Sequence, residues 1–364
     1  MNPFALTAGL LILFAAISSC SNPAATTTNN TDYKRYLYLT EWTNGRVFYY
    51  DPTTRSVSSS SLVTTAPGAG EIRFYRGIGY VAVGSGTGGV YYFNPADSSP
   101  IARLLPGSAS LNAEYFAFAS ATKAYFSTVA PLNNGTIVNS GSIYAFNPSN
   151  PNAGATQIIG LPDKYWQEIV IGSDGMLYAT ENLDQSVVRI NPEYNTVAAT
   201  FHTSQTGPTG LAVGSFDGQA GVFVANTGGS IDFVANSPFT GSATTVATYS
   251  ISQFYPARMV QLPNGSLVVV GSQSSSPYNG HTYLVTVSGA NVSSGEIKAN
   301  NASFGGNFSI AHDGDNDLTY VPTNMYNTSN SLYVFNGAGV QKSFSPVSMA
   351  PSAGNLSNVA FYQD

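Results

Sequence analysis

Short runs of apolar residues, each closed by a polar turn, follow one another along most of the chain. One type of run, rich in Val, Ile, Tyr and Phe, ends in Asp, Asn or Ser followed by Pro or another turn-forming residue, which is typical of a β-strand stopped by a turn. It recurs as RVFYYDP (46–52), GVYYFNP (89–95), SIYAFNP (142–148), SVVRINP (186–192), SIDFVAN (230–236), TYLVTVSG (282–289) and SLYVFNG (331–337). These segments repeat at intervals of roughly 43 to 53 residues with no amphipathic helical stretch between them, which predicts the blades of a β-propeller.

Upstream of the recurring strand lies a second shared piece, a strand, a tight turn and another strand. Examples are EIVIGSDGMLYATE (168–181), RMVQLPNGSLVVVG (258–271) and SIAHDGDNDLTYVP (309–322). The Asp-Gly and Asn-Gly pairs suit two-residue hairpins, whose positive φ angles few residues other than Gly, Asn and Asp adopt at low cost. Each blade then has inner strands A and B, the recurring strand C, and a variable outer strand D.

The two ends of the chain complete one blade between them. No strand A precedes Arg35, whereas APSAGNLSNVAFYQD (350–364) matches the start of a later blade, TGPTGLAVGSFDG (206–218). A C-terminal strand that completes blade 1 closes the ring and removes open sheet edges. The prediction is an all-β, seven-bladed propeller of four-stranded blades over residues 34–364.

The first 20 residues have the features of an export signal. The apolar run from Phe4 to Ile17 is shorter than an ordinary membrane-spanning helix and suits a secretory leader. Ile17-Ser18-Ser19-Cys20 resembles the lipobox of bacterial lipoproteins, in which Cys20 is lipidated, and residues 21–33 read as a flexible tether. We expect an exported protein, an outer-membrane or cell-surface lipoprotein or a periplasmic or extracellular one, that meets the membrane only through its lipid. The alternative is an ordinary cleaved signal peptide with an incidental cysteine.

Composition excludes several classes of site. Charged residues make up 9% of the chain, against about 25% in typical globular proteins, and the net charge is −6. Nucleic acid is therefore not an expected partner. Cys20 is the only cysteine, so disulfides and thiolate metal sites are excluded. The three histidines show no metal-binding spacing and no nucleophile motif is present, so no catalytic or metal-ligating residue is assigned.

Two stretches carry a family resemblance. RYLYLTEWTNGRVFYYDP (35–52) and GPTGLAVGSFDGQAGVFVANTGGSIDFVANSPFTG (207–241) resemble YVTN-repeat and NHL-type propellers, including the bacterial lactonase-like group related to 6-phosphogluconolactonase. The resemblance covers the whole folded region and implies the fold, with lactone hydrolysis as the activity it allows. Gly70-Glu71 resembles the first metal-binding glutamate of gluconolactonase-type propellers. Ile72-Arg73-Phe74 and Pro208-Thr209-Gly210 depart from that pattern, and the departures put a metal site in doubt.

Aligning the starts of the A strands predicts a ring of residues at the channel mouth. In blade order these are Asn358, Glu71, Glu114, Glu168, Gly210, Arg258 and Ser309. Three neighbouring carboxylates suggest a site for a cation, for a cationic ligand or for a polyhydroxyl ligand, and a divalent cation is the one cofactor considered. Alternatively, these side chains bond to backbone N–H groups of adjacent A strands and only fix neighbouring blades.

A second ring lies at the ends of the B strands, where LYLTEW and LYATEN place Glu41 and Glu181 in matching positions. Turn capping is the simpler role for these two acids. Trp166, next to Glu168, is a candidate stacking surface, although such aromatics often only pack between blades. The proposed ligand-binding set is Glu71, Glu114, Glu168, Arg258, Asn358, Glu41, Glu181 and Trp166.

Three functions are compatible with the sequence. The leading hypothesis is a non-enzymatic, surface-anchored propeller that binds a small molecule or a surface protein at the channel mouth, with long loops at 129–140 and 272–280 as its rim. The second is a lactonase-like hydrolase, and the third is a structural or adhesion component of the cell surface.

Overall fold

The structure is a computed structural model of the 364-residue chain. It describes residues 33–84, 88–129, 132–133, 136–137, 141–158, 160–161, 164–227, 229–237, 244–248, 254–273, 280–288, 291–297, 309–323, 330–348 and 355–362. The predicted signal peptide, Cys20 and the tether up to residue 32 lie outside the described residues, as do most of the two expected rim loops.

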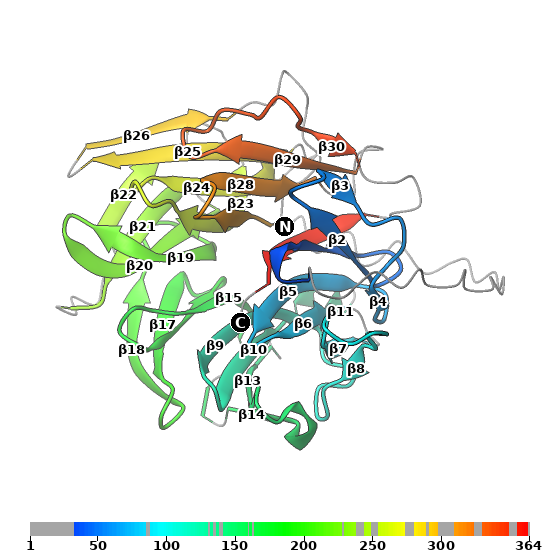
Figure 1. The fold of residues 1–364 in the computed structure, drawn as a ribbon. Coiled ribbons are helices and arrows are strands. Elements are labelled where there is room, and N and C mark those ends of the chain that lie inside the picture. Colours follow the sequence, from blue (N-terminus) through cyan, green and yellow to red (C-terminus); the bar gives the residue numbers. More distant parts are fainter. Residues whose placement is uncertain are drawn as a thin grey trace.

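Seven antiparallel sheets surround a central axis like the blades of a propeller (Figure 1), which confirms the predicted fold. The first four blades, each from inner to outer strand, are as follows. Blade 1 has β31 (Leu356–Phe361), β1 (Leu37–Glu41), β2 (Arg46–Asp51) and β3 (Ser56–Val57), and β4 (Val63–Thr64) also pairs with β2; blade 2 has β5 (Ala69–Tyr75), β6 (Ile78–Val83), β7 (Gly89–Phe93) and β8 (Arg103–Leu104); blade 3 has β9 (Ala113–Ser120), β10 (Lys123–Thr128), β13 (Ile143–Phe146) and β14 (Ala155–Gln157); blade 4 has β15 (Trp166–Ile171), β16 (Leu177–Glu181), β17 (Ser186–Asn191) and β18 (Thr196–His202).

The remaining three blades repeat the same order. Blade 5 has β19 (Pro208–Phe216), β20 (Gln219–Asn226), β21 (Ser230–Ala235) and β22 (Thr244–Thr248); blade 6 has β23 (Phe254–Gln261), β24 (Leu267–Gln273), β25 (Gly280–Ser288) and β26 (Asn291–Glu296); blade 7 has β27 (Ala311–Asp313), β28 (Leu318–Pro322), β29 (Ser331–Asn336) and β30 (Val347–Ser348). A small hairpin of β11 (Leu132–Asn133) and β12 (Thr136–Ile137) stands in the B–C connection of blade 3, and two 3-10 turns, η2 (Tyr33–Arg35) and η3 (Pro151–Ala153), complete the described elements.

The C-terminal strand closes the ring in the predicted way. β31 pairs antiparallel with β1, with Leu37 opposite Phe361 and Thr40 opposite Asn358. All five residues of β1 are buried, because one side packs on blade 2 and the other on blade 7. Strands buried on both faces read as continuous rather than alternating apolar runs, which explains the composition of the repeated segments.

The inner strands share one irregularity that positions the candidate site. In blades 1 to 6 the pairing of strands A and B shifts register near the start of strand A, as between Ala69 and Ile72 of β5 or between Trp166 and Ile169 of β15. Such a β-bulge adds a residue to one strand and can redirect a side chain. In these six blades the bulges place one residue of the A strand at an equivalent level of the channel.

None of the helical turns in the described part of the chain is long and apolar enough to cross a membrane.

Candidate binding site in the central channel

The strand register identifies the residues of the channel ring. Asn358, Glu71, Glu168, Gly210, Arg258 and Ser309 occupy equivalent positions, as the sequence alignment predicts. In blade 3 the register differs by one residue from the alignment. Ala113 lies opposite Thr128 and Phe116 opposite Phe126, so Tyr115, rather than Glu114, stands at the level of Glu71.

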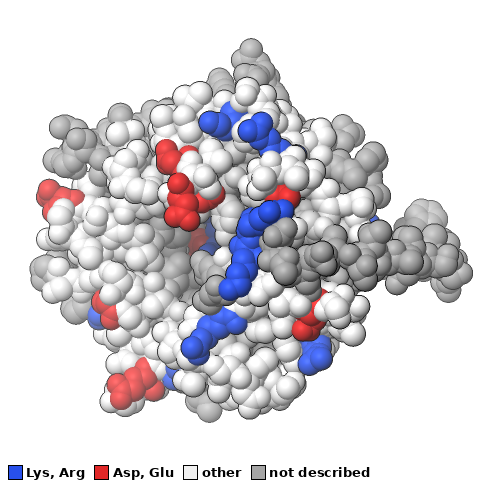
Figure 2. All heavy atoms as spheres, in the orientation of Figure 1, with Lys and Arg blue, Asp and Glu red and all other residues white. Residues whose placement is uncertain are grey.

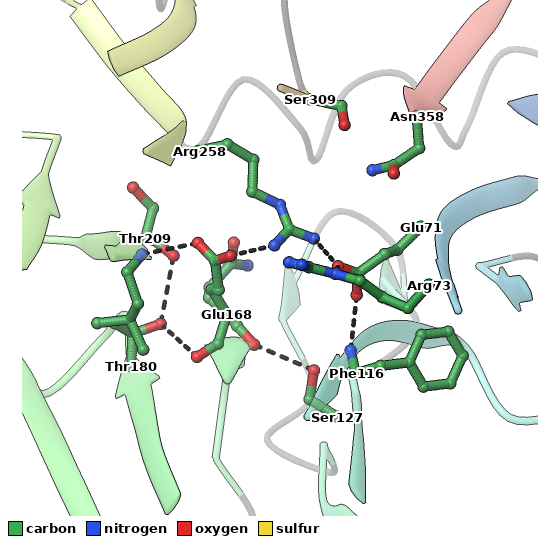
Figure 3. Close-up of polar contacts among 12 residues, drawn as sticks. Glu71, Arg73, Phe116, Ser127, Glu168, Thr180, Thr209, Arg258, Ser309 and Asn358 are labelled. Carbon is green, nitrogen blue, oxygen red and sulfur yellow. Dashed lines mark hydrogen bonds and ion pairs between the residues drawn. The ribbon is translucent and has the colours of Figure 1, made fainter. Parts of the chain in front are cut away.

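Arg258 joins two of the predicted carboxylates across the channel. Its Nη2 lies 2.5 Å from Oε1 of Glu71 in blade 2, and its Nη1 forms an ion pair with Oε1 of Glu168 in blade 4 (Figure 3). The three side chains are at most 5% exposed. The cation that neighbouring carboxylates require is therefore supplied by the chain itself.

The second oxygen of each carboxylate binds the next blade. Oε2 of Glu71 accepts the backbone N–H of Phe116 at 2.6 Å, and Oε2 of Glu168 accepts that of Leu211 at 2.7 Å. Two other ring residues make the same bond: Oδ1 of Asn358 accepts the N–H of Ile72 at 3.3 Å, and Oγ of Ser309 accepts that of Val359 at 3.2 Å. The blade-fixing role weighed against ligand binding is thus present in four of the seven blades.

Arg73 is a charged residue of the site that the sequence alignment did not select. It follows Glu71 by two residues on β5, and alternate residues of a strand share a face. Its Nε donates to Oε1 of Glu71 at 2.7 Å, and its side chain is 44% exposed. Figure 3 shows it beside Glu71 with its guanidinium directed towards that of Arg258. The two-residue spacing was the available signal.

Glu114 is half-buried and differs from the other two glutamates in having no hydrogen bond or ion pair to any described residue. Burial raises the pKa of Glu114 to about 7; Arg258 opposes the rise and the charge of Glu71 adds to it. The neighbouring Tyr115 lies under the guanidinium of Arg258, 4.4 Å from ring centroid to Cζ. Glu114 is therefore a carboxyl group whose charge can change near neutral pH.

Burial also raises the pKa of Glu168, while the Arg258 guanidinium and the Leu211 amide favour the carboxylate and oppose the rise. Burial raises the pKa of Tyr115 and Tyr255 well above the ordinary range, and the charge of Glu114 contributes to both. These aromatic side chains thus share the electrostatic environment of Glu114, although Tyr255 belongs to blade 6 and Glu114 to blade 3.

The acids of the second ring bind turn backbone, as expected for caps. Both oxygens of Glu41 accept the N–H of Asn44 at 3.1 Å, and one also pairs with Arg46. Glu181 accepts the N–H groups of Tyr165, Leu183 and Asp184. Neither acid has a free oxygen directed at the channel, so we place the candidate site in the first ring.

Trp166 does not supply the stacking surface considered from the sequence. It is 1% exposed and packs in the apolar cluster between blades 3 and 4, with Tyr125, Ile169 and Leu177 among its neighbours in that cluster. Its position at the bulge, directly before Gln167 and Glu168, turns the indole into the core while Glu168 turns into the channel.

The described residues contain no group of three or more His, Cys, Asp or Glu side chains arranged to hold a metal ion. The space between Glu71 and Glu168, where a divalent cation was considered, holds the guanidinium of Arg258. His281 pairs instead with Glu296 at 2.7 Å, and His312 contacts Thr319 at 3.1 Å. The donor set in the channel therefore fits a resident guanidinium better than a divalent cation.

Solved structures with the same architecture include three bacterial propellers. The chain is 13% identical to the periplasmic gluconolactonase of Pseudomonas aeruginosa, with a TM-score of 0.65 over 90% of this chain and 99% of that one. It is 13% identical to a putative 6-phosphogluconolactonase of Bacteroides fragilis, with a TM-score of 0.65 over 94% and 100% of the two chains. It is 14% identical to virginiamycin B lyase of Staphylococcus aureus, with a TM-score of 0.60 over 82% of this chain and 90% of that one.

The chain has the propeller fold of these lactonase-like and lyase proteins. No family model matches the sequence, and no curated protein does. Identities this low establish a shared fold and leave the chemistry to the residues of the site.

Proposed function

We propose that this protein binds a small polar molecule in its central channel. The observation that carries the proposal is the charged core of Glu71, Arg73, Glu168 and Arg258 at the level where the A strands bulge. Figure 2 shows a hollow at the centre of the ring with charged atoms at its base.

The chemistry of the core supports a binding role. Burying charged groups costs several kcal/mol per ion, and well-packed apolar side chains often stabilise a fold as well as a buried ion pair does. Among the described residues, no buried ion pair of this kind joins blades 5, 6 and 7 to one another, so neighbouring blades can pack without one. Perturbed carboxyl groups in a hollow of a rigid scaffold are the usual signature of a binding or catalytic site.

A thermal-shift screen with sugars, sugar acids, lactones, amines and divalent cations tests the proposal. A ligand at a hundredfold excess over its dissociation constant stabilises a protein by about 2.7 kcal/mol. The variant Arg73→Gln removes an exposed channel charge, and Arg76→Gln, on the exposed turn between β5 and β6, is the matched control. We expect a ligand that raises the Tm of the wild type and of Arg76→Gln but not of Arg73→Gln. Equal shifts in all three proteins, or no shift with any compound, would contradict it.

Lactone hydrolysis is the second candidate, because Glu114 has a pKa of about 7 and no polar partner among the described residues. A group that titrates near the working pH is suited to general acid–base catalysis. Hydrolysis of a lactone panel, measured with and without chelator, separates the two functions. Lactone hydrolysis by the wild type that is lost in Glu114→Gln, while the variant still binds the lactone, would favour the enzyme.

We also propose that the propeller is exported and anchored through a lipid on Cys20, on the strength of the lipobox-like sequence. Mass spectrometry of the membrane fraction should then find a lipidated N-terminal Cys20, and Cys20→Ala should release the protein into the soluble fraction.

A structural or adhesive role has weaker support, because the most exposed large apolar side chains, such as Ile101, Tyr194 and Val340, belong to different blades.

A further inference from the structure

We infer that the ligand of the channel presents a singly charged carboxylate, bound by hydrogen-bond donors of Ser309, Asn358, Arg258 and Arg73. The inference rests on the proposed small-molecule binding and names the chemical class of the ligand. It reverses the expectation of a cationic ligand, because the carboxylate oxygens of Glu71 and Glu168 are already bound to Arg258 and to backbone N–H groups.

The acceptors on the blade 7 and blade 1 side of the channel are in use. Oδ1 of Asn358 accepts the backbone N–H groups of Ile72 at 3.3 Å and of Val359 at 2.9 Å. The oxygen of this amide is thereby identified, and its Nδ2 remains as a donor with no partner among the described residues. Oγ of Ser309 accepts the N–H of Val359, which leaves its hydroxyl hydrogen free to donate.

The arginines add donors to the same space. Nε of Arg258 is buried and has no hydrogen-bond partner in the described part of the chain, whereas its two Nη atoms hold the glutamates. Arg73 uses Nε on Glu71, and no described residue accepts from its Nη atoms. In Figure 3 the side chains of Ser309 and Asn358 point towards the guanidinium of Arg258, with Arg73 across from them.

Three of the four residues are buried, and Nε of Arg258 is a buried donor atom without a partner among the described residues, whereas Arg73 is partly exposed. Ser309, Arg258 and Asn358 are 2%, 4% and 6% exposed. Buried polar groups in native proteins are nearly always paired, and a buried donor without an acceptor marks a place where another group binds. Donors from three blades that converge without an acceptor fit an oxyanion.

The charge balance selects a singly charged group. Arg73 and Arg258 are offset by Glu71 and Glu168, and the nearby Glu114 adds negative charge when it ionises. The site thus lacks the excess of positive charge that a doubly charged phosphate requires, whereas a carboxylate needs mainly donors. Figure 2 shows a band of Lys and Arg passing beside the hollow, which would draw an anion inwards, and acidic side chains gather on another side.

Calorimetric titration with a matched pair of probes tests the inference. Glucuronate and glucose differ in one carboxylate, and inorganic phosphate is the third probe. Asn358→Asp keeps an oxygen for the amides of Ile72 and Val359 but replaces the donor with a negative oxygen. We expect glucuronate to bind wild type at least tenfold more tightly than glucose or phosphate, and Asn358→Asp to lose that preference. Ser309→Ala, which removes one donor, should weaken glucuronate severalfold, and Arg76→Gln should have no effect.

The outcomes separate the inference from the proposed function. Binding of glucose as tight as that of glucuronate, or unchanged binding of glucuronate by both Asn358→Asp and Ser309→Ala, would overturn the carboxylate assignment while small-molecule binding stands. Tighter binding of phosphate would overturn the choice of a singly charged ligand. Failure of every compound, in this titration and in the wider screen, would overturn both. If Asn358→Asp does not fold, Ser309→Ala alone decides.

Discussion

At the scale of single residues, Arg258 determines the character of the site. It lies 187 positions from Glu71 and 90 from Glu168 along the chain, yet it contacts both and covers the ring of Tyr115. Its two Nη atoms neutralise carboxylates, and its Nε faces the proposed ligand space. One side chain thus links the stability of the ring to the chemistry of the channel.

Replacing Arg258 by Leu should destabilise the fold strongly, because it leaves Glu71 and Glu168 buried without a counter-charge. Removing one partner of a buried ion pair costs about 3–5 kcal/mol. The loss should shrink as the pH falls from 7 to 5, since burial raises the pKa of Glu168 and protonation removes its charge. Urea denaturation at both pH values measures the loss. Arg46→Leu, which breaks the partly exposed pair with Glu41, serves as the control and should cost less. A loss for Arg258→Leu no larger than that of the control would contradict the prediction.

Glu114 should make stability fall between about pH 4.5 and pH 7. Burial raises the pKa of Glu114 from 4.5 to about 7, so across this window the folded state holds a proton that the unfolded state has released. The penalty is complete above pH 7 and amounts to at most about 3 kcal/mol. The charged or titratable groups that interact with it are Arg258, Glu71, Tyr115, Tyr165 and Tyr255.

Free energies of unfolding at pH 5 and pH 8 test this sign. The pH dependence should be smaller in Glu114→Gln than in wild type, and it should stay in Glu193→Gln, where an exposed acid outside the channel is replaced. If the free energy of unfolding of Glu114→Gln changes between pH 5 and pH 8 as much as that of wild type, another group is responsible for the pH dependence.

At the scale of elements, the blades were predictable and the bulges were not. Strand C is recognisable because apolar runs and Asx turns repeat with a constant order, and every blade in the structure contains it. A bulge adds one residue to a strand but leaves no mark in the sequence pattern. Aligning the blades by residue type therefore selected Glu114 in blade 3, where the strand register places Tyr115. Arg258 was predicted as a ring residue, whereas Arg73 was missed because its contribution depends on the direction of its side chain in the channel.

Hydroxyl groups at the bulges join neighbouring blades, and Thr209 provides a test. Its Oγ1 donates to the carbonyl of Pro256 at 2.6 Å, from β19 of blade 5 to β23 of blade 6. Thr209→Val keeps the shape and leaves that carbonyl without this donor, which should cost about 1–3 kcal/mol. Thr209→Ser retains the hydroxyl and should cost less, as thermal denaturation can measure. Equal losses in the two variants would show that the methyl group, not the hydrogen bond, matters.

At the scale of the whole molecule, the closed ring depends on the pairing of the two ends. β31 holds one side of β1 from Leu37 to Glu41 and packs against blades 2 and 7. A sheet edge exposed by its removal would be free to pair with other chains.

Deletion of residues 355–364 should therefore expose β1 and lead to aggregation, with lost hydrogen-exchange protection from Tyr36 to Glu41. Deletion of the last two residues alone leaves β31 intact and is the control. Hydrogen exchange and size-exclusion chromatography distinguish the two. Normal protection of β1 in the longer deletion would mean that β31 does not stabilise it.

The same closure sets an order for folding during synthesis. β1 emerges from the ribosome long before its partner β31, because Thr40 of β1 and Ser357 of β31 are 317 positions apart along the chain. Blades 2 to 7 can pair their strands as they are synthesised, because the strands of each of these blades follow one another in the sequence. Blade 1 alone has to wait for a strand from a distant part of the chain, so until β31 has been synthesised its apolar β1 strand has an open edge that a chaperone could bind.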